Sequence, residues 1–202
     1  MVQYNPSKKY QIVIIRVNQS VVYSNYLYLF PNNIQAHINS FFSYHDKLVA
    51  FTSAMLKYYY LPAILAIEPT EIQIEIDNYG KPYLLNYPAI DFNISHSGEY
   101  VVLAVAVGKK IGIDIELIDE HIDLTIKSIV FNECEERIIN NYYDFFVLWS
   151  KKEAYLKCLG LGFNNKIYQH TKLNNQWLES FNQHEIITFN FEKDYILSIC
   201  SS

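Results

Sequence analysis

The spacing of apolar residues changes from segment to segment along this chain, and this change constrains the fold more than any other sequence feature. Between about His45 and Tyr60 apolar residues recur every three or four positions, which is typical of a helix with one buried face. From Ile72 to Ile76 they alternate with polar residues, as on a strand. Strand-like runs and helical spacing occur again in the second half. The sequence therefore predicts an α+β fold.

The expected elements run in the order strand, helices, strands, and then again strands, helices, strands. Expected strands lie at Gln11–Val17, Ile72–Ile76, Phe92–Ser95, Tyr100–Val107, Ile111–Leu117, Lys166–Leu173 and Ile186–Ile199, and expected helices begin at Pro31 and span His45–Tyr60, Ile122–Ile139 and Asp144–Leu159. Pro62 is expected to follow the end of the second helix, and Gly160 and Gly162 to stop the last one. This order predicts two similar α+β halves in one chain, residues 1–107 and 108–202, although no strong sequence repeat relates them.

Composition limits the classes of partner. Half of the residues are hydrophobic and 18% are charged, which is typical of a folded globular protein. The net charge of −5 argues against nucleic-acid binding, because that needs clustered cations, but it leaves room for one small phosphorylated ligand. The three cysteines lie far apart and suggest neither a zinc site nor disulfides (Cys134, Cys158 and Cys200). With no apolar run long enough for a signal peptide or a membrane span, we expect a cytoplasmic protein that binds no membrane.

The segment Gly112–Glu116 carries two acids at strand spacing. Residues two apart on a strand share a face, so Asp114 and Glu116 lie side by side. Two neighbouring carboxylates repel each other unless a proton or a metal ion lies between them. Oxygen ligands without His or Cys are typical of Mg²⁺. Taken alone, however, the segment is better explained by a solvated strand face with two acids.

Two further segments suggest a chemical role only in combination with these acids. Glu153 and Lys157 are four apart on a predicted helix, where a surface ion pair is the simpler explanation. Beside Asp114 and Glu116, they would add a third carboxylate for a metal and a cation for a phosphate, as pyrophosphate chemistry requires. The segment Asn93–Gly98 combines hydroxyls, an imidazole and a glycine turn, which suits an anion site or an ordinary hairpin.

Four ordered blocks across residues 79–162 together resemble the surfactin-type 4'-phosphopantetheinyl transferases. The blocks are Tyr79-Gly80-Lys81-Pro82, FNISHSG, GIDIE and WSKKEAYLKCLGLG. The first half is similar to the family more loosely, around Asp46 and Lys47, where relatives often have an Asp-Arg pair. The resemblance implies two similar α+β halves with coenzyme A in the cleft between them. It also implies an Mg²⁺-dependent enzyme that moves the phosphopantetheine arm of coenzyme A onto a serine of an apo acyl, peptidyl or polyketide carrier protein.

The resemblance also implies residue roles. Asp114, Glu116 and Glu153 match the family's magnesium ligands, and Lys157 matches the lysine that contacts the pyrophosphate. Glu153 is the candidate base for the serine proton. The expected coenzyme A contacts are Lys47, Lys81, Pro82, Ser95, His96, Asp114 and Lys157. This chain offers His37, Lys47 and Lys57 where relatives often carry arginines. The expected active form is a monomer, and the alternatives are a coenzyme A pyrophosphatase or a non-catalytic coenzyme A-binding module.

Overall fold

The protein folds into two halves that each combine a sheet with helices, as predicted. The structure is a computed structural model that describes residues 10–161, 180–181 and 184–202. The first sheet has the order β1-β5-β4 and contains β1 (Gln11–Arg16), β5 (Tyr100–Val107) and β4 (Ile90–Ser97). The second sheet has the order β6-β9-β8-β7 and contains β6 (Ile111–Leu117), β9 (Tyr195–Ser201), β8 (His184–Phe191) and β7 (Ser180–Phe181). Neighbouring strands in both sheets are antiparallel.

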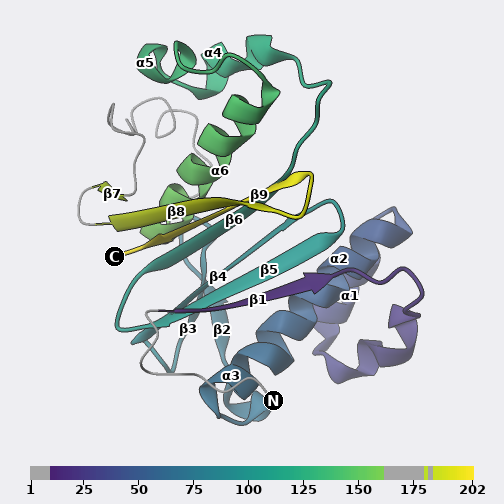
Figure 1. The fold of residues 1–202 in the computed structure, drawn as a ribbon. Coiled ribbons are helices and arrows are strands. Elements are labelled where there is room, and N and C mark those ends of the chain that lie inside the picture. The colour runs from purple at the N-terminus through teal and green to yellow at the C-terminus, as the bar shows by residue number, and fades with distance from the viewer. Residues whose placement is uncertain (1–9, 162–179, 182–183) are drawn as a thin grey trace.

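The remaining elements surround the two sheets: the first-half helices cover the outer face of the first sheet, and one long helix of the second half covers that of the second, with the short second-half helices beyond it (Figure 1). In the first half these are η1 (Tyr23–Leu29), α1 (Asn32–Ser40), α2 (Tyr44–Met55), η2 (Leu56–Tyr60), α3 (Leu61–Leu65) and η3 (Pro69–Glu71), with a small hairpin of β2 (Ile74–Ile76) and β3 (Pro82–Leu84). In the second half they are η4 (Leu124–Ile126), α4 (Lys127–Val130), α5 (Glu133–Glu136) and the long α6 (Tyr142–Leu159). The expected strand at 166–173 and Gly162 lie outside the described residues, and the boundary between residues 107 and 108 stays a prediction.

Strand β5 lies at the centre of the molecule and is buried on both faces. Val101, Leu103 and Val105 belong to the core beneath the first-half helices. The residues between them pack against the isoleucines of β6 and the apolar face of β9. The result is a layered order of helices, first sheet, second sheet and α6 (Figure 1). A strand buried on both faces explains why its sequence is continuously apolar rather than alternating.

The second predicted helix does not end before Pro62. Helix α2 passes into a π-helical turn, Leu56–Tyr60, and then into α3, whose first turn contains Pro62. Proline has no N–H to donate, and its ring clashes with a carbonyl in a regular helix interior. A π-turn alters the local hydrogen-bond pattern and so relieves that conflict. The combined helix Tyr44–Leu65 has the length and hydropathy of a membrane span, but Leu48, Leu56 and Leu61 are buried in the first-half core.

Alternate side chains of β4 join the two halves. Strand β6 is the edge strand of its sheet as far as the structure describes the chain, so every second N–H of β6 lacks a strand partner there. Polar side chains at alternate positions of β4 accept these N–H groups. The donor–acceptor pairs are Ile111 N to Asp91 Oδ2 (2.8 Å), Ile113 N to Asn93 Oδ1 (3.0 Å), Ile115 N to Ser95 Oγ (3.5 Å) and Leu117 N to Ser97 Oγ (3.0 Å). This ladder aligns β6, which carries the acid pair, with β4.

Candidate active site

Helix α6 lies directly on β6 because Gly112 has no side chain. A Cβ at Gly112 would collide with the carbonyl oxygen of Ala154 and with the backbone of Cys158. Gly112, Asp114 and Glu116 share one face of β6, since side chains alternate along a strand. The close contact at Gly112 therefore directs both acids toward α6.

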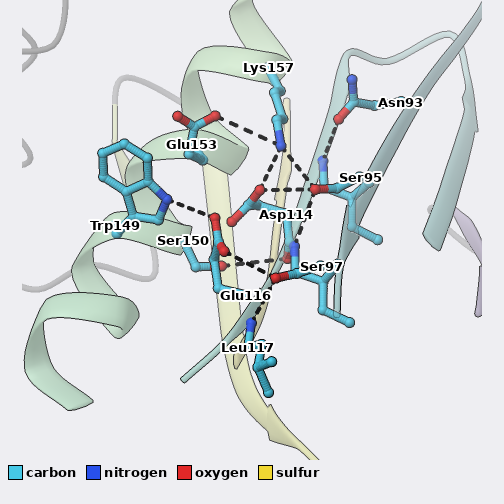
Figure 2. A network of polar contacts seen from close by, with 12 residues as sticks. Asn93, Ser95, Ser97, Asp114, Glu116, Leu117, Trp149, Ser150, Glu153 and Lys157 are labelled. Atoms are coloured by element: carbon cyan, nitrogen blue, oxygen red, sulfur yellow. Dashed lines mark hydrogen bonds and ion pairs between the residues drawn. The ribbon is translucent and has the colours of Figure 1, made fainter. Parts of the chain in front are cut away.

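One stripe of α6 faces these acids (Figure 2). Trp149, Glu153 and Lys157 are spaced four apart, so they follow one side of the helix. Lys157 Nζ lies 2.5 Å from Asp114 Oδ1 and 3.8 Å from Glu153 Oε2. At the other end of the stripe, Trp149 Nε1 donates to Glu116 Oε1 at 2.7 Å. The sequence-predicted acids and lysine therefore come together in one cluster.

Two serines of β4 complete the cluster. Ser95 Oγ donates to Asp114 Oδ1 at 3.0 Å, and Lys157 Nζ donates to Ser95 Oγ at 3.0 Å. Ser97 Oγ donates to Glu116 Oε2 at 3.4 Å. Each acid of β6 thus has a donor from β4 and a donor from α6, and both halves contribute to the site.

The cluster holds more negative charge than positive charge. Burial, reinforced by repulsion from Asp114, raises the pKa of Glu116 to about 7. Burial also raises the pKa of Glu153 to about 6, although Lys157 opposes this change. Burial disfavours the charge on Lys157, but the carboxylates of Asp114 and Glu153 outweigh it and raise its pKa. Within the described part of the chain, three carboxylates share one lysine, so the site favours an additional cation.

The residues present fit a magnesium ion. Asp114 is 1% exposed, and its Oδ2 is buried with no hydrogen-bond partner among the residues that the structure describes. This carboxylate oxygen lies beside two acids with raised pKa values. A hard divalent cation would bind the oxygen and stabilise the ionised form of the acids. Among the described residues, no group of three His, Cys, Asp or Glu side chains already surrounds one point. The assignment of Asp114, Glu116 and Glu153 as metal ligands therefore stays a prediction.

Ser95 and His96, which the resemblance places near one phosphate of coenzyme A, point to opposite faces of β4, and their shared contact with that phosphate stays a prediction. Both lie within β4, not in the turn that follows it, and adjacent strand residues point to opposite faces. Ser95 joins the acid cluster, whereas His96 lines a separate cavity. The two residues therefore have different immediate surroundings, although Lys157 contacts Ser95 and also lowers the pKa of His96.

That cavity has a volume of about 600 Å³ and lies between α1, α2 and β4. Its polar lining comes from His37, His45, Asp46, Ser53, Lys57 and His96. Desolvation lowers the pKa of Lys57. Desolvation and then repulsion from Lys157 lower the pKa of His96. A bound anion would stabilise the charged form of both groups, so the lining suits a phosphate.

Lys47 is not among the residues that line the cavity, although the sequence favoured it as the first-half phosphate contact. Along α2, the cavity is lined by the side chains of His45, Asp46, Val49, Ala50, Ser53 and Ala54, and by Lys57 in the π-turn. Lys47 does not share that stripe of the helix. The structure therefore favours Lys57 over Lys47 as the basic residue of this cavity.

Lys81 has an internal partner. Its Nζ donates to Asp91 Oδ2 at 2.8 Å and to the Ile111 carbonyl at 3.0 Å, and the Cys158 carbonyl lies 3.5 Å away. The Lys81 side chain is only 9% exposed. The ammonium thus links β4, β6 and the last turn of α6, and it points neither at the cavity nor at the acids. A nucleotide contact by Lys81 and Pro82, which begins β3, stays a prediction.

Sequence reasoning missed Trp149, Ser97 and the β4 ladder. A signal for the ladder was available in residues 91–97, where short polar side chains occupy every second position of the strand (Asp91, Asn93, Ser95 and Ser97). Nothing in the sequence pattern distinguished the indole of Trp149 from a core aromatic residue, because its partner lies far away along the chain.

Comparisons with known proteins agree with this arrangement. Residues 19–108 match the family model described as 4'-phosphopantetheinyl transferase, N-terminal, and residues 110–200 match that of the 4'-phosphopantetheinyl transferase superfamily. The chain is 32% identical over 185 residues to the 4'-phosphopantetheinyl transferase gsp of Aneurinibacillus migulanus, covering 81% of this chain and 73% of that protein. It is 31% identical over 148 residues to a 4'-phosphopantetheinyl transferase of Bacillus subtilis, covering 67% of this chain and 66% of the relative. A third relative, the L-aminoadipate-semialdehyde dehydrogenase-phosphopantetheinyl transferase of Schizosaccharomyces pombe, is 33% identical over 140 residues, which are 59% of this chain and 54% of that protein.

Proposed function

This chain belongs to the 4'-phosphopantetheinyl transferase superfamily, and on that premise we propose that it modifies a carrier protein. In the proposed reaction it transfers the 4'-phosphopantetheine arm of coenzyme A to a serine of an apo acyl, peptidyl or polyketide carrier protein. The reaction releases 3',5'-ADP and depends on Mg²⁺. The observation that carries the proposal is the orphaned Asp114 Oδ2 within a cluster of three acids and Lys157.

The two faces of β4 support a division of labour within the proposed site. His96 faces the basic cavity, whereas Ser95, next to it in the strand, contacts Asp114 and Lys157. A nucleotide phosphate in the cavity would be held by Lys57 and His96. The pyrophosphate would then extend past the edge of β4 to Lys157. Coenzyme A has one phosphate for the cavity and a pyrophosphate for Lys157, whereas a simple ester substrate has neither.

The proposed chemistry is a substitution at the β-phosphorus of coenzyme A. The carrier serine oxygen forms the new bond to that phosphorus, and the bond to the oxygen that bridges the two phosphates breaks. Glu153 accepts the serine proton, for which a pKa of about 6 leaves it mostly ionised near neutral pH. Lys157 stabilises the negative charge that grows on the departing 3',5'-ADP. When bound by Asp114, Glu116 and Glu153, Mg²⁺ supplies a second positive charge to the pyrophosphate oxygens.

The test is to incubate the protein with coenzyme A, Mg²⁺ and a panel of apo carrier proteins, and to weigh the products by mass spectrometry. We expect one carrier to gain a phosphopantetheine arm and excess EDTA to prevent this. Cleavage of coenzyme A with no carrier present would indicate a pyrophosphatase instead. Binding of coenzyme A without either reaction would indicate a non-catalytic module.

We also propose that the active species is a monomer, because one chain contains both halves and both contribute to the cluster. The test is gel filtration with light scattering to measure the mass of each fraction, together with an activity assay of the same fractions. Activity confined to a larger assembly, and lost on dilution, would contradict it.

A further inference from the structure

We propose that Trp149 is a positioning residue that orients Glu116 for the metal through its indole N–H. The inference rests on the proposed function, since it concerns a carboxylate assigned there to Mg²⁺. Trp149 touches neither of the reacting groups in that proposal and acts only through Glu116. It therefore differs from Glu153 and Lys157, which share its stripe on α6.

The contact from Trp149 is short and addresses a single oxygen. Nε1 lies 2.7 Å from Glu116 Oε1, while Ser97 Oγ lies 3.4 Å from Oε2 (Figure 2). An indole has one N–H and no acceptor, so this contact has only one possible polarity. With one donor on each oxygen, the plane of the Glu116 carboxylate is held from both α6 and β4. Each oxygen retains acceptor capacity for a metal ion.

The indole itself is held by packing. It stacks on Phe145, one turn earlier on α6, with ring centroids 6.2 Å apart and an interplanar angle of 10°. Phe145 is 3% exposed and packs in the core between α6 and the helices that precede it. The donor therefore comes from a rigid platform, which is what orientation of a ligand requires.

A neutral donor suits this position better than a charged one. Asp114 is already paired with the ammonium of Lys157. A second ammonium at Glu116 would neutralise the carboxylate and compete with a cation for it. The indole N–H instead orients Glu116 and leaves its negative charge available. The two acids of β6 are thus held differently, one by a cation and the other by a neutral N–H.

The experiment measures metal binding rather than turnover. Mn²⁺, which accepts the same oxygen ligands as Mg²⁺, is titrated into the protein with coenzyme A present and carrier protein absent, and free Mn²⁺ is counted by electron paramagnetic resonance. The variant Trp149→Phe keeps an aromatic ring against Phe145 and removes the N–H. The matched control Tyr143→Phe removes a different donor from α6, one that contacts Asn190 at 2.8 Å.

We expect Trp149→Phe to weaken Mn²⁺ binding about 10- to 100-fold, the usual effect of losing a partner of a metal ligand. Tyr143→Phe should bind like the unmodified protein. Mn²⁺ affinity of Trp149→Phe within about twofold of the unmodified protein would overturn the inference and leave the proposed function intact. If the unmodified protein bound no Mn²⁺, the metal site of the proposed function would fail, and this inference with it.

A second measurement covers the case in which Trp149→Phe does not fold. In a Trp177→Phe chain, Trp149 is the remaining tryptophan. Its fluorescence should be quenched by Mn²⁺ over the same concentration range in which the free Mn²⁺ signal disappears. Bound Mn²⁺ with no change in this fluorescence would place the metal away from Glu116 and overturn the inference.

Discussion

Glu116→Gln should stabilise the metal-free protein at alkaline pH while it removes the proposed activity. The glutamine keeps an oxygen that can accept from Trp149 Nε1, and its amide can donate to Ser97. Only the charge is lost. The unmodified protein, in contrast, must keep a buried carboxylate ionised beside Asp114 when no metal is bound. The effect on stability therefore isolates the repulsion within the acid cluster.

The magnitude follows from the pKa of Glu116, which burial and Asp114 raise from 4.5 to about 7. Between these two values the folded protein binds more protons than the unfolded chain, so its stability falls as the pH rises. Above pH 7, a pKa shift of this size destabilises the folded protein by at most about 3 kcal/mol, at 1.36 kcal/mol for each pKa unit. Near pH 5 the same linkage predicts that ionisation of Glu116 destabilises the folded protein by less than about 1 kcal/mol. The gain from Glu116→Gln should thus be large at pH 8 and small at pH 5.

The assay is urea unfolding of both proteins in EDTA at pH 5, 6, 7 and 8. The free energy of unfolding of the unmodified protein should decline across this range relative to that of the variant. Added Mg²⁺ should stabilise the unmodified protein at pH 8 more than the variant, because a ligand stabilises the form that binds it. An equal difference at pH 5 and pH 8, or a variant less stable at pH 8, would refute the reasoning.

Three further substitutions test neighbouring parts of the structure. Lys57→Met should raise the Michaelis constant for coenzyme A about tenfold, the value of one charge-assisted hydrogen bond, whereas its control Lys47→Met should change it little; equal effects would contradict the cavity assignment. Lys157→Ala should lower the turnover number more than it raises the Michaelis constant, as for a group that acts in the transition state; a change in the Michaelis constant alone would make Lys157 a ground-state contact. Lys81→Met should lower the free energy of unfolding by about 3–5 kcal/mol, because it leaves Asp91 charged, buried and without its cation. Urea unfolding measures this change. A loss below about 1 kcal/mol would mean that the ion pair is not needed for stability.

Local periodicity carried much of the fold and part of the site. Alternation along β6 is sufficient to place Asp114 and Glu116 on one face, and helical spacing is sufficient to place Glu153 and Lys157 on one stripe. Both follow from backbone geometry within a single element. The same geometry also separates Ser95 from His96, although their flanking glycine and serine residues had suggested a turn.

Contacts between distant segments were beyond such patterns. Which helix would cover the acids depends on the close approach at Gly112, and the partner of Trp149 lies on another element. Lys81 resembles a loop residue in the sequence, yet packing buries its ammonium against Asp91 and the end of α6. The sequence offers both Lys47 and Lys57 as phosphate contacts, but of these two only Lys57 lines the cavity, because the helix turns Lys47 to another side. The sequence by itself determined the direction of each side chain within its own strand or helix. Only the tertiary structure decided what each side chain meets, because packing brings together residues that no local period relates.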